Sequence, residues 1–431
     1  MPRDESGPAI AVVGAGIAGA SLAWFLRERL GDQSRIDVYE ATDRIGGRLR
    51  SVSVGGARFE AGGKYLHERN RCIGGFIERF DLDREPVSRD TSRTGVWDGV
   101  EFGLTTATME PVTLFRLLTR YGLSPRRVRT ETKSVADRFD GIYDHAETAF
   151  ETPEALLEAV GLMEVYTRSG REYLTDGGID TRFVDELVAG TTRTIYGQNP
   201  TLNAVACLVA LTGMGSGTYT LEAPNAELCR RLLAGANATV NTETPVERVA
   251  VGRDETRLET PSETRRYDAV CVATPAEFAA IELSGVSPPD GYGNRDFSEL
   301  SVAYIAGRLD PSYFGAQSVD DVPELVVTGS DSTVEFVHLR DVSERADQPV
   351  YKLTTRDGAD STLLDALFTN VDDIAEVSWR AFPRMEPTTP LPPFRLADGL
   401  YYPNAMESVA STMETQAIAG RTVANLVARD Y

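Results

Sequence analysis

The sequence predicts an α/β protein in which one domain, built from discontinuous segments, is interleaved with a second, mixed helix-and-sheet domain. The first 40 residues have the pattern of a βαβ unit, residues from about 73 to 190 have mostly helical spacing, and alternating helix and strand patterns return after residue 226. We therefore expect the first domain to comprise residues 1–70, 221–290 and 391–431. Residues 71–220 (mostly helical) and 291–390 (a sheet) form the second.

The individual elements follow from the apolar spacing along the chain. Strands are predicted at 10–13, 36–39, 239–241, 246–252, 257–260, 269–273, 302–309, 325–328 and 334–338. Helices are predicted at 20–30, 111–120, 124–139, 153–160, 226–234 and about 411–429, with a proline-rich crossing segment at 387–393.

The charge of the chain is strongly negative. It has 431 residues with 44 Lys and Arg against 65 Asp and Glu, a net charge of −21, and no cluster of five or more basic residues. We expect no nucleic-acid partner, because phosphate neutralisation supplies most of that affinity. Only Lys64, Lys133 and Lys352 are lysines. A lysine-poor acidic surface is typical of a protein from a halophilic, archaeal-type cell, where salt screens self-repulsion; an ordinary acidic protein from a GC-rich genome is the alternative.

Cysteines and membrane signals are sparse. The four cysteines form no CxxC pair and have no histidine at ligand spacing, so we expect neither a disulfide framework nor a metal site. The apolar stretch 9–26 has the length of a membrane span, but Gly14, Gly16 and Gly19 interrupt it. The residues before it lack the positive region of a signal peptide. We expect a soluble, cytoplasmic protein without a transmembrane segment.

A glycine motif indicates a bound dinucleotide. Gly14, Gly16 and Gly19 follow a predicted strand and open a helix, and Glu40 ends the next strand 21 residues after Gly19. The glycines permit a tight turn, close approach of a pyrophosphate and close helix packing, while the helix N-terminus faces the phosphates. Glu40 is expected to accept hydrogen bonds from the ribose hydroxyls, which disfavours NADP. A glycine-rich turn without a ligand is the alternative.

The residues after Glu40 resemble a known group of proteins. Together with Glu40, they form a Glu-x3-Arg-x-Gly-Gly-Arg signature, which ends in Arg44-Ile-Gly46-Gly47-Arg48. This signature resembles that of FAD-binding oxidases of the amine-oxidase type. This resemblance implies a Rossmann-type FAD domain of the GR2 kind. It also implies that the paired glycines and Arg48 lie along the FAD diphosphate.

Further motifs narrow the resemblance to the prenylcysteine oxidase/lyase family. In this family a Gly-Gly pair is followed four residues later by His, as in Gly62-Gly63-Lys-Tyr-Leu-His67 here. Similar stretches, in the same order, are 196–198, 203–204, 215–217, 400–404, 411–414 and 417–420. The similarity spans nearly the whole chain and is weakest at about 90–172 and 310–370.

The resemblance implies an FAD enzyme that oxidises the carbon next to a thioether sulfur by hydride transfer to the flavin. Water addition then gives an aldehyde and a free thiol, and O2 reoxidises the flavin with release of H2O2. The implied substrate is small, apolar and of prenyl type. The alternatives are an isoprenoid or carotenoid desaturase, another amine-oxidase-type flavoenzyme, and a non-catalytic FAD-binding protein.

Two departures from the amine-oxidase pattern bear on this function. The strand 301–308, which corresponds best to the strand carrying a lysine near flavin N5 in amine oxidases, has no lysine, so an amine substrate is disfavoured. No cysteine follows Cys271, in the region where some relatives attach FAD covalently. The FAD is therefore expected to be non-covalent.

The candidate site residues follow from these motifs. His67 is the candidate for deprotonating the attacking water or lining the pocket, with a purely structural role as the alternative; Tyr196 and Gln198 are candidate walls of the same site. Asn404 to Glu407 are expected to pass under the flavin, and the helix after Ser411 to point its N–H groups at flavin O2. The cofactor candidates are Gly14, Ala15, Gly16, Ile17, Ala18, Gly19, Glu40, Ala41, Gly46, Gly47, Arg48, Gly62, Gly63, Val246, Ala273, Asn404, Glu407, Thr412 and Met413.

Overall fold

A six-stranded sheet forms the centre of the first domain. The structure, a computed structural model, describes residues 7–87, 93–107, 109–213, 216–253 and 255–431. The strand order is β10-β2-β1-β14-β22-β21, and all neighbours are parallel except β21 and β22. The strands are β1 Ala9–Val13, β2 Arg35–Tyr39, β10 Thr239–Asn241, β14 Ala269–Val272, β22 Leu400–Tyr401 and β21 Arg395–Ala397. They come from three separate stretches of chain, which confirms the predicted α/β class.

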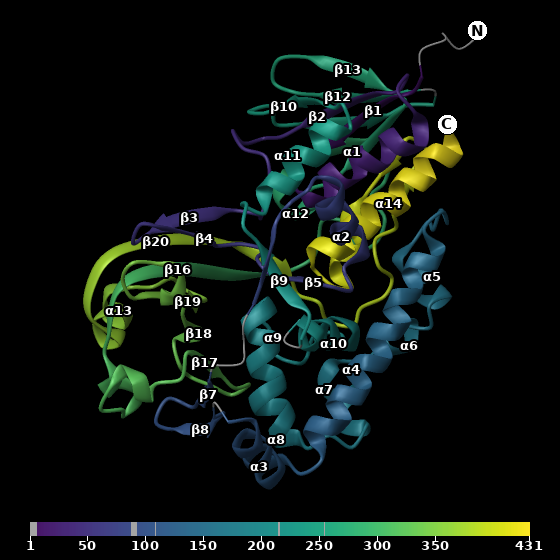
Figure 1. Ribbon diagram of the computed structural model, residues 1–431. Coiled ribbons are helices and arrows are strands. Elements are labelled where there is room, and N and C mark those ends of the chain that lie inside the picture. Colours follow the sequence, from purple (N-terminus) through teal and green to yellow (C-terminus); the bar gives the residue numbers. More distant parts are fainter. Residues whose placement is uncertain (1–6, 88–92, 108, 214–215, 254) are drawn as a thin grey trace.

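Two helices from opposite ends of the chain pack side by side against this sheet (Figure 1). Helix α1 (Ile17–Leu30) begins directly after Gly16, and α14 (Met413–Asp430) closes the chain. A Cβ at Gly420 of α14 would lie 2.9 Å from the backbone N of Leu22 in α1, so glycine sets how closely these helices approach. Helix α11 (Ala226–Gly235) packs beside α1.

A seven-stranded sheet forms the second domain, with the order β20-β16-β19-β18-β17-β7-β8. Its strands are β7 Thr94–Trp97, β8 Phe102–Thr105, β16 Phe297–Leu309, β17 Leu325–Thr328, β18 Phe336–Asp341, β19 Val350–Thr355 and β20 Phe368–Pro383. Successive side chains of β16 point to opposite faces of the sheet. Ile305 packs into a cluster with Trp97, whereas Tyr304 faces the β3–β4 hairpin (Ser51–Val54 and Ala57–Glu60).

Helices build the wall of the second domain opposite the sheet. They are α3 Glu110–Tyr121, α4 Ser124–Asp140, α5 Pro153–Ala159, α6 Met163–Tyr166, α7 Gly170–Asp176, α8 Thr181–Phe183, α9 Ala189–Tyr196 and α10 Ala204–Gly213. The predicted helices at 111–120, 124–139 and 153–160 are present within one residue at each end. Helix α10 was not predicted, because it is apolar on nearly every side and contacts α4, α7 and α9.

The helical prediction for residues 73–190 misses three strands, namely β6 (Arg84–Pro86), β7 and β8. Each has three or four residues, too few for a period-2 pattern to be recognised, and β7 is held by pairing with distant β17. Strand β20 was also missed, because much of it is exposed and polar, while β16 supplies its backbone partners. Tertiary pairing, not local sequence, makes these segments strands.

The remaining elements pack against one or the other of these two sheets and their helices. They are β5 Leu66–His67, β9 Thr218–Leu221, α2 Arg71–Arg79, α12 Ala276–Ala279 and α13 Ser361–Leu367, with a four-stranded sheet of β11 Arg248–Val251, β12 Thr256–Glu259, β13 Thr264–Tyr267 and β15 Glu282–Ser284. Within the described residues, no helix combines the length and apolar character that a membrane crossing requires.

Candidate active site

The glycine-rich turn after β1 meets the predicted acidic residue. Gly14 has a φ of +106°, a conformation that favours glycine. A Cβ at Gly19 would clash with the carbonyl oxygen of Gly14, so the turn can fold back on α1 only with glycine there. The backbone N–H of Ala15 donates to a carboxylate oxygen of Glu40 at 3.0 Å. The turn, the start of α1 and an acidic side chain therefore lie together.

The second glycine pair lies directly against the first turn. The N–H of Gly46 donates to the carbonyl oxygen of Ala15 at 3.0 Å. Gly47 has a φ of +55°, and a Cβ on it would lie 3.2 Å from the Cα of Gly16. A Cβ on Gly16 would make only ordinary contacts, the nearest at 3.7 Å, so protein packing does not by itself demand glycine at this position. A backbone cradle without side chains results, which suits a diphosphate.

A buried network of charges closes one side of this cradle. Arg48 forms an ion pair with Glu407, whose side chain is fully buried, and also donates to the carbonyl oxygen of Ala381 at 2.7 Å. Arg295 pairs with Glu277 at 2.7 Å and lies 3.9 Å from Glu407. The side-chain oxygen of Asn404 is buried in the same region and has no partner within the described chain. An unpaired acceptor beside a glycine cradle fits a cofactor that brings hydrogen-bond donors.

The other predicted cofactor residues lie around this region. Ala273, directly after β14, donates from its N–H to the carbonyl oxygen of Val13 at 2.8 Å, and its own carbonyl oxygen lies against Gly14. Val246 is buried just before β11. Thr412 is the N-cap of α14 and accepts from the N–H of Thr415 at 3.1 Å. Ile17, Ala18, Ala41, Gly62, Gly63 and Met413 lie on segments that adjoin the cradle.

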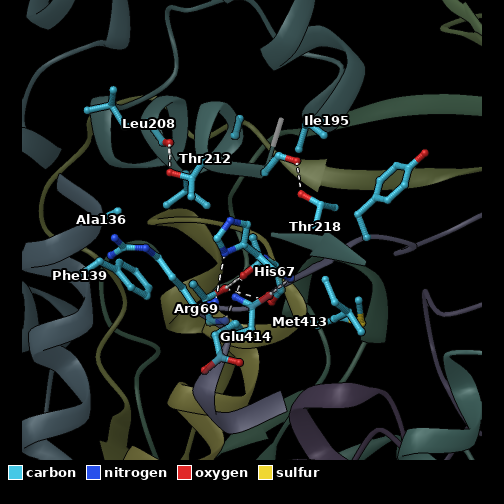
Figure 2. A pocket seen from close by; sticks show the side chains of 18 of the residues that line it. His67, Arg69, Ala136, Phe139, Ile195, Leu208, Thr212, Thr218, Met413 and Glu414 are labelled. Carbon is cyan, nitrogen blue, oxygen red and sulfur yellow. Dashed lines mark hydrogen bonds between the residues drawn. The ribbon is translucent and has the colours of Figure 1, made fainter. Parts of the chain in front are cut away.

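An apolar cavity of about 150 Å³ lies at the start of α14, between β5, β9 and helices α4, α9 and α10 (Figure 2). Phe139 of α4, Ile195 of α9 and Leu208 of α10 line it, and His67 and Met413 stand at its floor. A Cβ at Gly63 would lie 3.8 Å from the side chain of Met413, so the cavity adjoins the Gly62–Gly63 segment. The arrangement suits an apolar ligand held close to the cofactor cradle.

His67 has hydrogen-bond partners on both ring nitrogens. Its Nδ1 accepts from the backbone N–H of Arg69 at 3.1 Å, and its Nε2 lies 2.9 Å from the carbonyl oxygen of Ser216. Because a carbonyl oxygen only accepts, these contacts assign the neutral tautomer with the proton on Nε2. The ring is therefore fixed in orientation at the cavity wall. Its catalytic role stays a prediction.

Tyr196 and Gln198 are placed differently from each other. Tyr196 ends α9, lines the cavity and packs edge-to-face on Phe382 at 5.3 Å. Its hydroxyl has no partner within the described residues, and burial raises its pKa. Gln198 does not line the cavity. Its side chain donates to the carbonyl oxygen of Pro383 at 2.9 Å and accepts from the N–H of Met385 at 3.1 Å, so it ties α9 to the end of β20.

Glu414 is a site residue that the sequence analysis missed. Its carboxylate accepts from the N–H groups of Cys72 and Ile73 at 2.8 and 2.9 Å, and from the hydroxyl of Tyr143 at 2.7 Å. It therefore caps the start of α2 and fixes that helix to the first turn of α14 beneath the cavity. Burial raises the pKa of Glu414, against the opposite effect of these hydrogen bonds. Its partners are distant in sequence, and no local motif signals them.

The sequence analysis also did not predict that Lys352 lies near this site. Strand β16 has none, as its sequence states, but Lys352 of the adjacent β19 is paired in register with Tyr304 of β16. The ammonium of Lys352 lies 6.0 Å from the centre of the Tyr304 ring, and the Tyr304 hydroxyl donates to the carbonyl oxygen of Glu60 at 2.8 Å. The second-domain sheet thus places a lysine beside the segment that leads to Gly62.

The overall fold defines the class of protein. The structure aligns with a solved triple mutant of putrescine oxidase over 98% of this chain and 99% of that chain, with a TM-score of 0.68 and 14% identity. Cyclohexylamine oxidase from Brevibacterium oxydans IH-35A aligns over the same shares with a TM-score of 0.65 and 15% identity. At such identities only the fold is shared. The protein has the fold of the amine-oxidase-type flavoproteins.

Sequence comparison identifies the family. Residues 12–80 match the NAD(P)-binding Rossmann-like domain, and residues 104–431 match the prenylcysteine lyase family. A farnesylcysteine lyase of Arabidopsis thaliana is 33% identical over 99% of this chain and 89% of its own length. Prenylcysteine oxidase 1 of Homo sapiens is 28% identical over 97% of this chain and 88% of its own length. The chain belongs to the prenylcysteine lyase family and is a flavin-dependent oxidoreductase, as its motifs predicted.

Proposed function

We propose that this protein is an FAD-dependent oxidase of prenyl thioethers. The observation that carries the proposal is the apolar cavity at His67 and Met413, which adjoins a backbone cradle suited to FAD in a chain of the prenylcysteine lyase family. The names of the relatives, farnesylcysteine lyase and prenylcysteine oxidase, support a thioether substrate with an isoprenoid chain. The reaction consumes the thioether, water and O2 and yields an aldehyde, a thiol and H2O2.

Bound FAD would accept a hydride from the carbon next to sulfur and pass two electrons to O2. The contribution of the protein is mainly orientation, because sulfur and the adjacent double bond stabilise the cationic carbon without help from a strong base. Phe139, Ile195 and Leu208 hold the isoprenoid chain, and the cavity limits the access of bulk water. Water then attacks the cation, and the resulting hemithioacetal collapses to the aldehyde and the thiol.

Non-covalent FAD binding is part of the proposal. All four cysteines are free thiols with buried side chains, and Cys271 lies within the central strand β14. Burial raises the pKa of the Cys271 thiol, so this sulfur is a poor nucleophile for covalent attachment. The cofactor would instead be held by Gly14 to Gly19, Glu40, Gly46 to Arg48, and Asn404 to Glu407.

We also propose that the protein works at high salt in the cytoplasm of a halophilic cell. Among the three lysines, Lys133 is exposed and pairs with Asp137, whereas Lys64 and Lys352 are partly buried. The exposed cations of a chain with a net charge of −21 are therefore nearly all arginines. Screening of carboxylate repulsion by salt suits such a surface.

The test of the function measures three products together. Purified flavoprotein is mixed with farnesylcysteine under air, and H2O2, free cysteine and the isoprenoid aldehyde are quantified. We expect equal amounts of the three. A desaturase releases no thiol, and a binding protein without turnover leaves the flavin oxidised under anaerobic conditions. Reduction of the flavin by amines or polyenes, but by no prenyl thioether, would reject the proposal.

A further inference from the structure

Two of the three lysines of this acidic chain meet beside the candidate active site. Lys64 follows Gly63 directly, and Lys352 lies on β19 of the second-domain sheet. Each is partly buried. Neither ammonium forms an ion pair or a hydrogen bond with any described residue, although the chain carries 65 carboxylate side chains. Unpaired lysines at such a place require an explanation, because surface positions were available to them.

Arg340 completes a cationic cluster with these lysines. It is the register partner of Lys352 across β18 and β19, and its guanidinium donates to the hydroxyl of Tyr65 at 2.5 Å. The ammonium of Lys64 lies 5.1 Å from the centre of the Tyr65 ring, and that of Lys352 lies 6.0 Å from the Tyr304 ring. Three cations therefore surround two tyrosines.

The surrounding acids do not neutralise this cluster. Arg345, which lies near Lys64, is already paired with Glu85. Glu60 and Glu344 act on Lys64 only at longer range and form no ion pair with it. Burial and the neighbouring cations lower the pKa of Lys64 and of Lys352 to about 8 each. Cations that are held together without counterions destabilise a fold unless an anion joins them.

Tyr65 connects the cluster with the apolar cavity. It contacts Lys64 and Arg340, and it also lines the cavity that contains His67. The apolar cavity and the cationic cluster thus meet at the side chain of Tyr65. A ligand that matches both has an apolar chain at one end and an anionic group at the other.

We propose that Lys64, Lys352 and Arg340 bind the carboxylate of the thioether substrate while its isoprenoid chain fills the cavity at His67. This inference rests on the proposed function and assigns the residues of that site that select a substrate with a free carboxylate. The enzyme would then discriminate against esters and amides of the same thioether. The lysines supply point charges, and Arg340 supplies paired donors.

The experiment compares four ligands on the flavin-loaded enzyme. Farnesylcysteine has both an amine and a carboxylate, its methyl ester lacks the carboxylate, S-farnesyl-3-mercaptopropionate lacks the amine, and S-farnesylcysteamine lacks the carboxylate. We expect kcat/KM to be about tenfold or more lower for the two ligands without a carboxylate, with most of the loss in KM, because a charged hydrogen bond is lost. For the ligand without an amine, kcat/KM is expected to stay within about threefold of the value for farnesylcysteine, because its carboxylate keeps the charged hydrogen bond.

Variants test whether the cluster causes this preference. Lys352→Met and Lys64→Met are expected to bring the acid and its ester within about threefold of each other, whereas Lys133→Met, at an exposed lysine, leaves the preference unchanged. Melting temperatures verify that each variant is folded. An unchanged preference in both cluster variants, or equal turnover of acid and ester by the natural protein, overturns the proposal.

A binding measurement separates this inference from the proposed function. Dodecanoate and dodecanol, which are not thioethers, are titrated into the oxidised enzyme, and the perturbation of the flavin spectrum is followed. Tighter binding of the acid, lost in Lys352→Met, supports the carboxylate subsite even if no thioether is oxidised. Equal binding of the two compounds rejects the subsite even if thioethers are oxidised. The binding of dodecanoate is also measured in the presence of inorganic phosphate or acetate. If both anions weaken it equally, the cluster is a general anion site, which contradicts the substrate assignment.

Discussion

Arg48 forms an ion pair with Glu407, a fully buried residue close to the other end of the chain. The pair joins the segment after Gly46–Gly47 to the segment before α14. Both residues were predicted to lie near the cofactor from separate motifs, and the pair brings those motifs together. The closing segment of the chain is therefore held to the glycine cradle by a buried charge contact.

Removal of Glu407 is expected to destabilise both the fold and cofactor retention. Glu407→Ala removes the charged partner of Arg48, whose side chain is one third exposed, and the loss of a hydrogen bond between charged groups costs about 1.5–3 kcal/mol. Denaturant unfolding and the FAD content after gel filtration measure the two effects. Glu282→Ala, which removes an exposed pair with Arg248, is the control and is expected to cost less than about 1 kcal/mol. Equal losses in the two variants would contradict a special role of Glu407.

Three glycine variants separate folding from cofactor binding. Gly19→Ala is expected to unfold the protein, because its Cβ would overlap the carbonyl oxygen of Gly14. A Cβ at Gly16 makes only ordinary contacts, so we expect Gly16→Ala to fold. Its FAD affinity should be strongly reduced, because the methyl group would occupy the cradle. Gly31→Ala, where a Cβ meets nothing within 4 Å but φ is +75°, controls for backbone strain alone. Circular dichroism and FAD titration distinguish the outcomes, and full FAD affinity in Gly16→Ala would place the diphosphate elsewhere.

His67→Ala tests whether the fixed ring acts as a base. Because both ring nitrogens are engaged by Arg69 and Ser216, we expect turnover to fall by less than about tenfold, without a change in the pH profile of kcat/KM. His67→Asn retains an acceptor for the Arg69 N–H and is expected to recover part of the loss. A decrease of about 10²–10⁴ together with a lost pH inflection would instead establish general-base catalysis.

Lys352 is expected to make stability depend on pH. Its pKa is about 8 in the folded protein against an ordinary value of 10.5, so the unfolded chain binds more protons between these values. The free energy of unfolding should therefore rise with pH across this window. Lys352→Met removes a charge that is costly at pH 7, and we expect a gain of about 1–2 kcal/mol there, after allowance for partial solvent exposure.

Melting curves recorded from pH 7 to pH 10.5 check this expectation. The advantage of Lys352→Met should shrink as the pH passes 8, because the natural lysine then loses its proton in the folded state. A constant difference across the whole range would show that packing, not charge, separates the two proteins. Lys133→Met, at an exposed ion pair, should show neither the gain nor the pH trend.

Salt is expected to stabilise the protein. At a net charge of −21, repulsion between carboxylates falls as the screening length shortens from about 10 Å at 0.1 M to about 3 Å at 1 M. The melting temperature should therefore rise between roughly 0.1 and 2 M KCl. A flat or falling melting temperature would favour the ordinary acidic protein. KCl and NaCl should act alike if screening is the cause.

Local sequence was sufficient wherever the structure depends on neighbouring residues. The turn at Gly14 to Gly19, the helix after it and the position of Glu40 could be predicted because strand, turn and helix are continuous in the chain. The family resemblance added Arg48 and Glu407, which lie far apart in sequence. It could not indicate that they pair with each other, because a motif gives positions but no contacts.

The tertiary structure alone decided which side chains meet around the cavity and at the second-domain sheet. Gln198 stands two residues after Tyr196, yet only Tyr196 faces the cavity, because α9 ends between them at Gly197, which has a φ of +67°. Lys64, Arg340 and Lys352 are brought together by the register of β18 and β19 and by the packing of the segment after Gly63 onto that sheet. Sequence determined the glycine turn and the position of Glu40 because strand, turn and helix are continuous there. Long-range strand pairing determined both sheets, and the energy of that pairing is not recorded in any short stretch of residues.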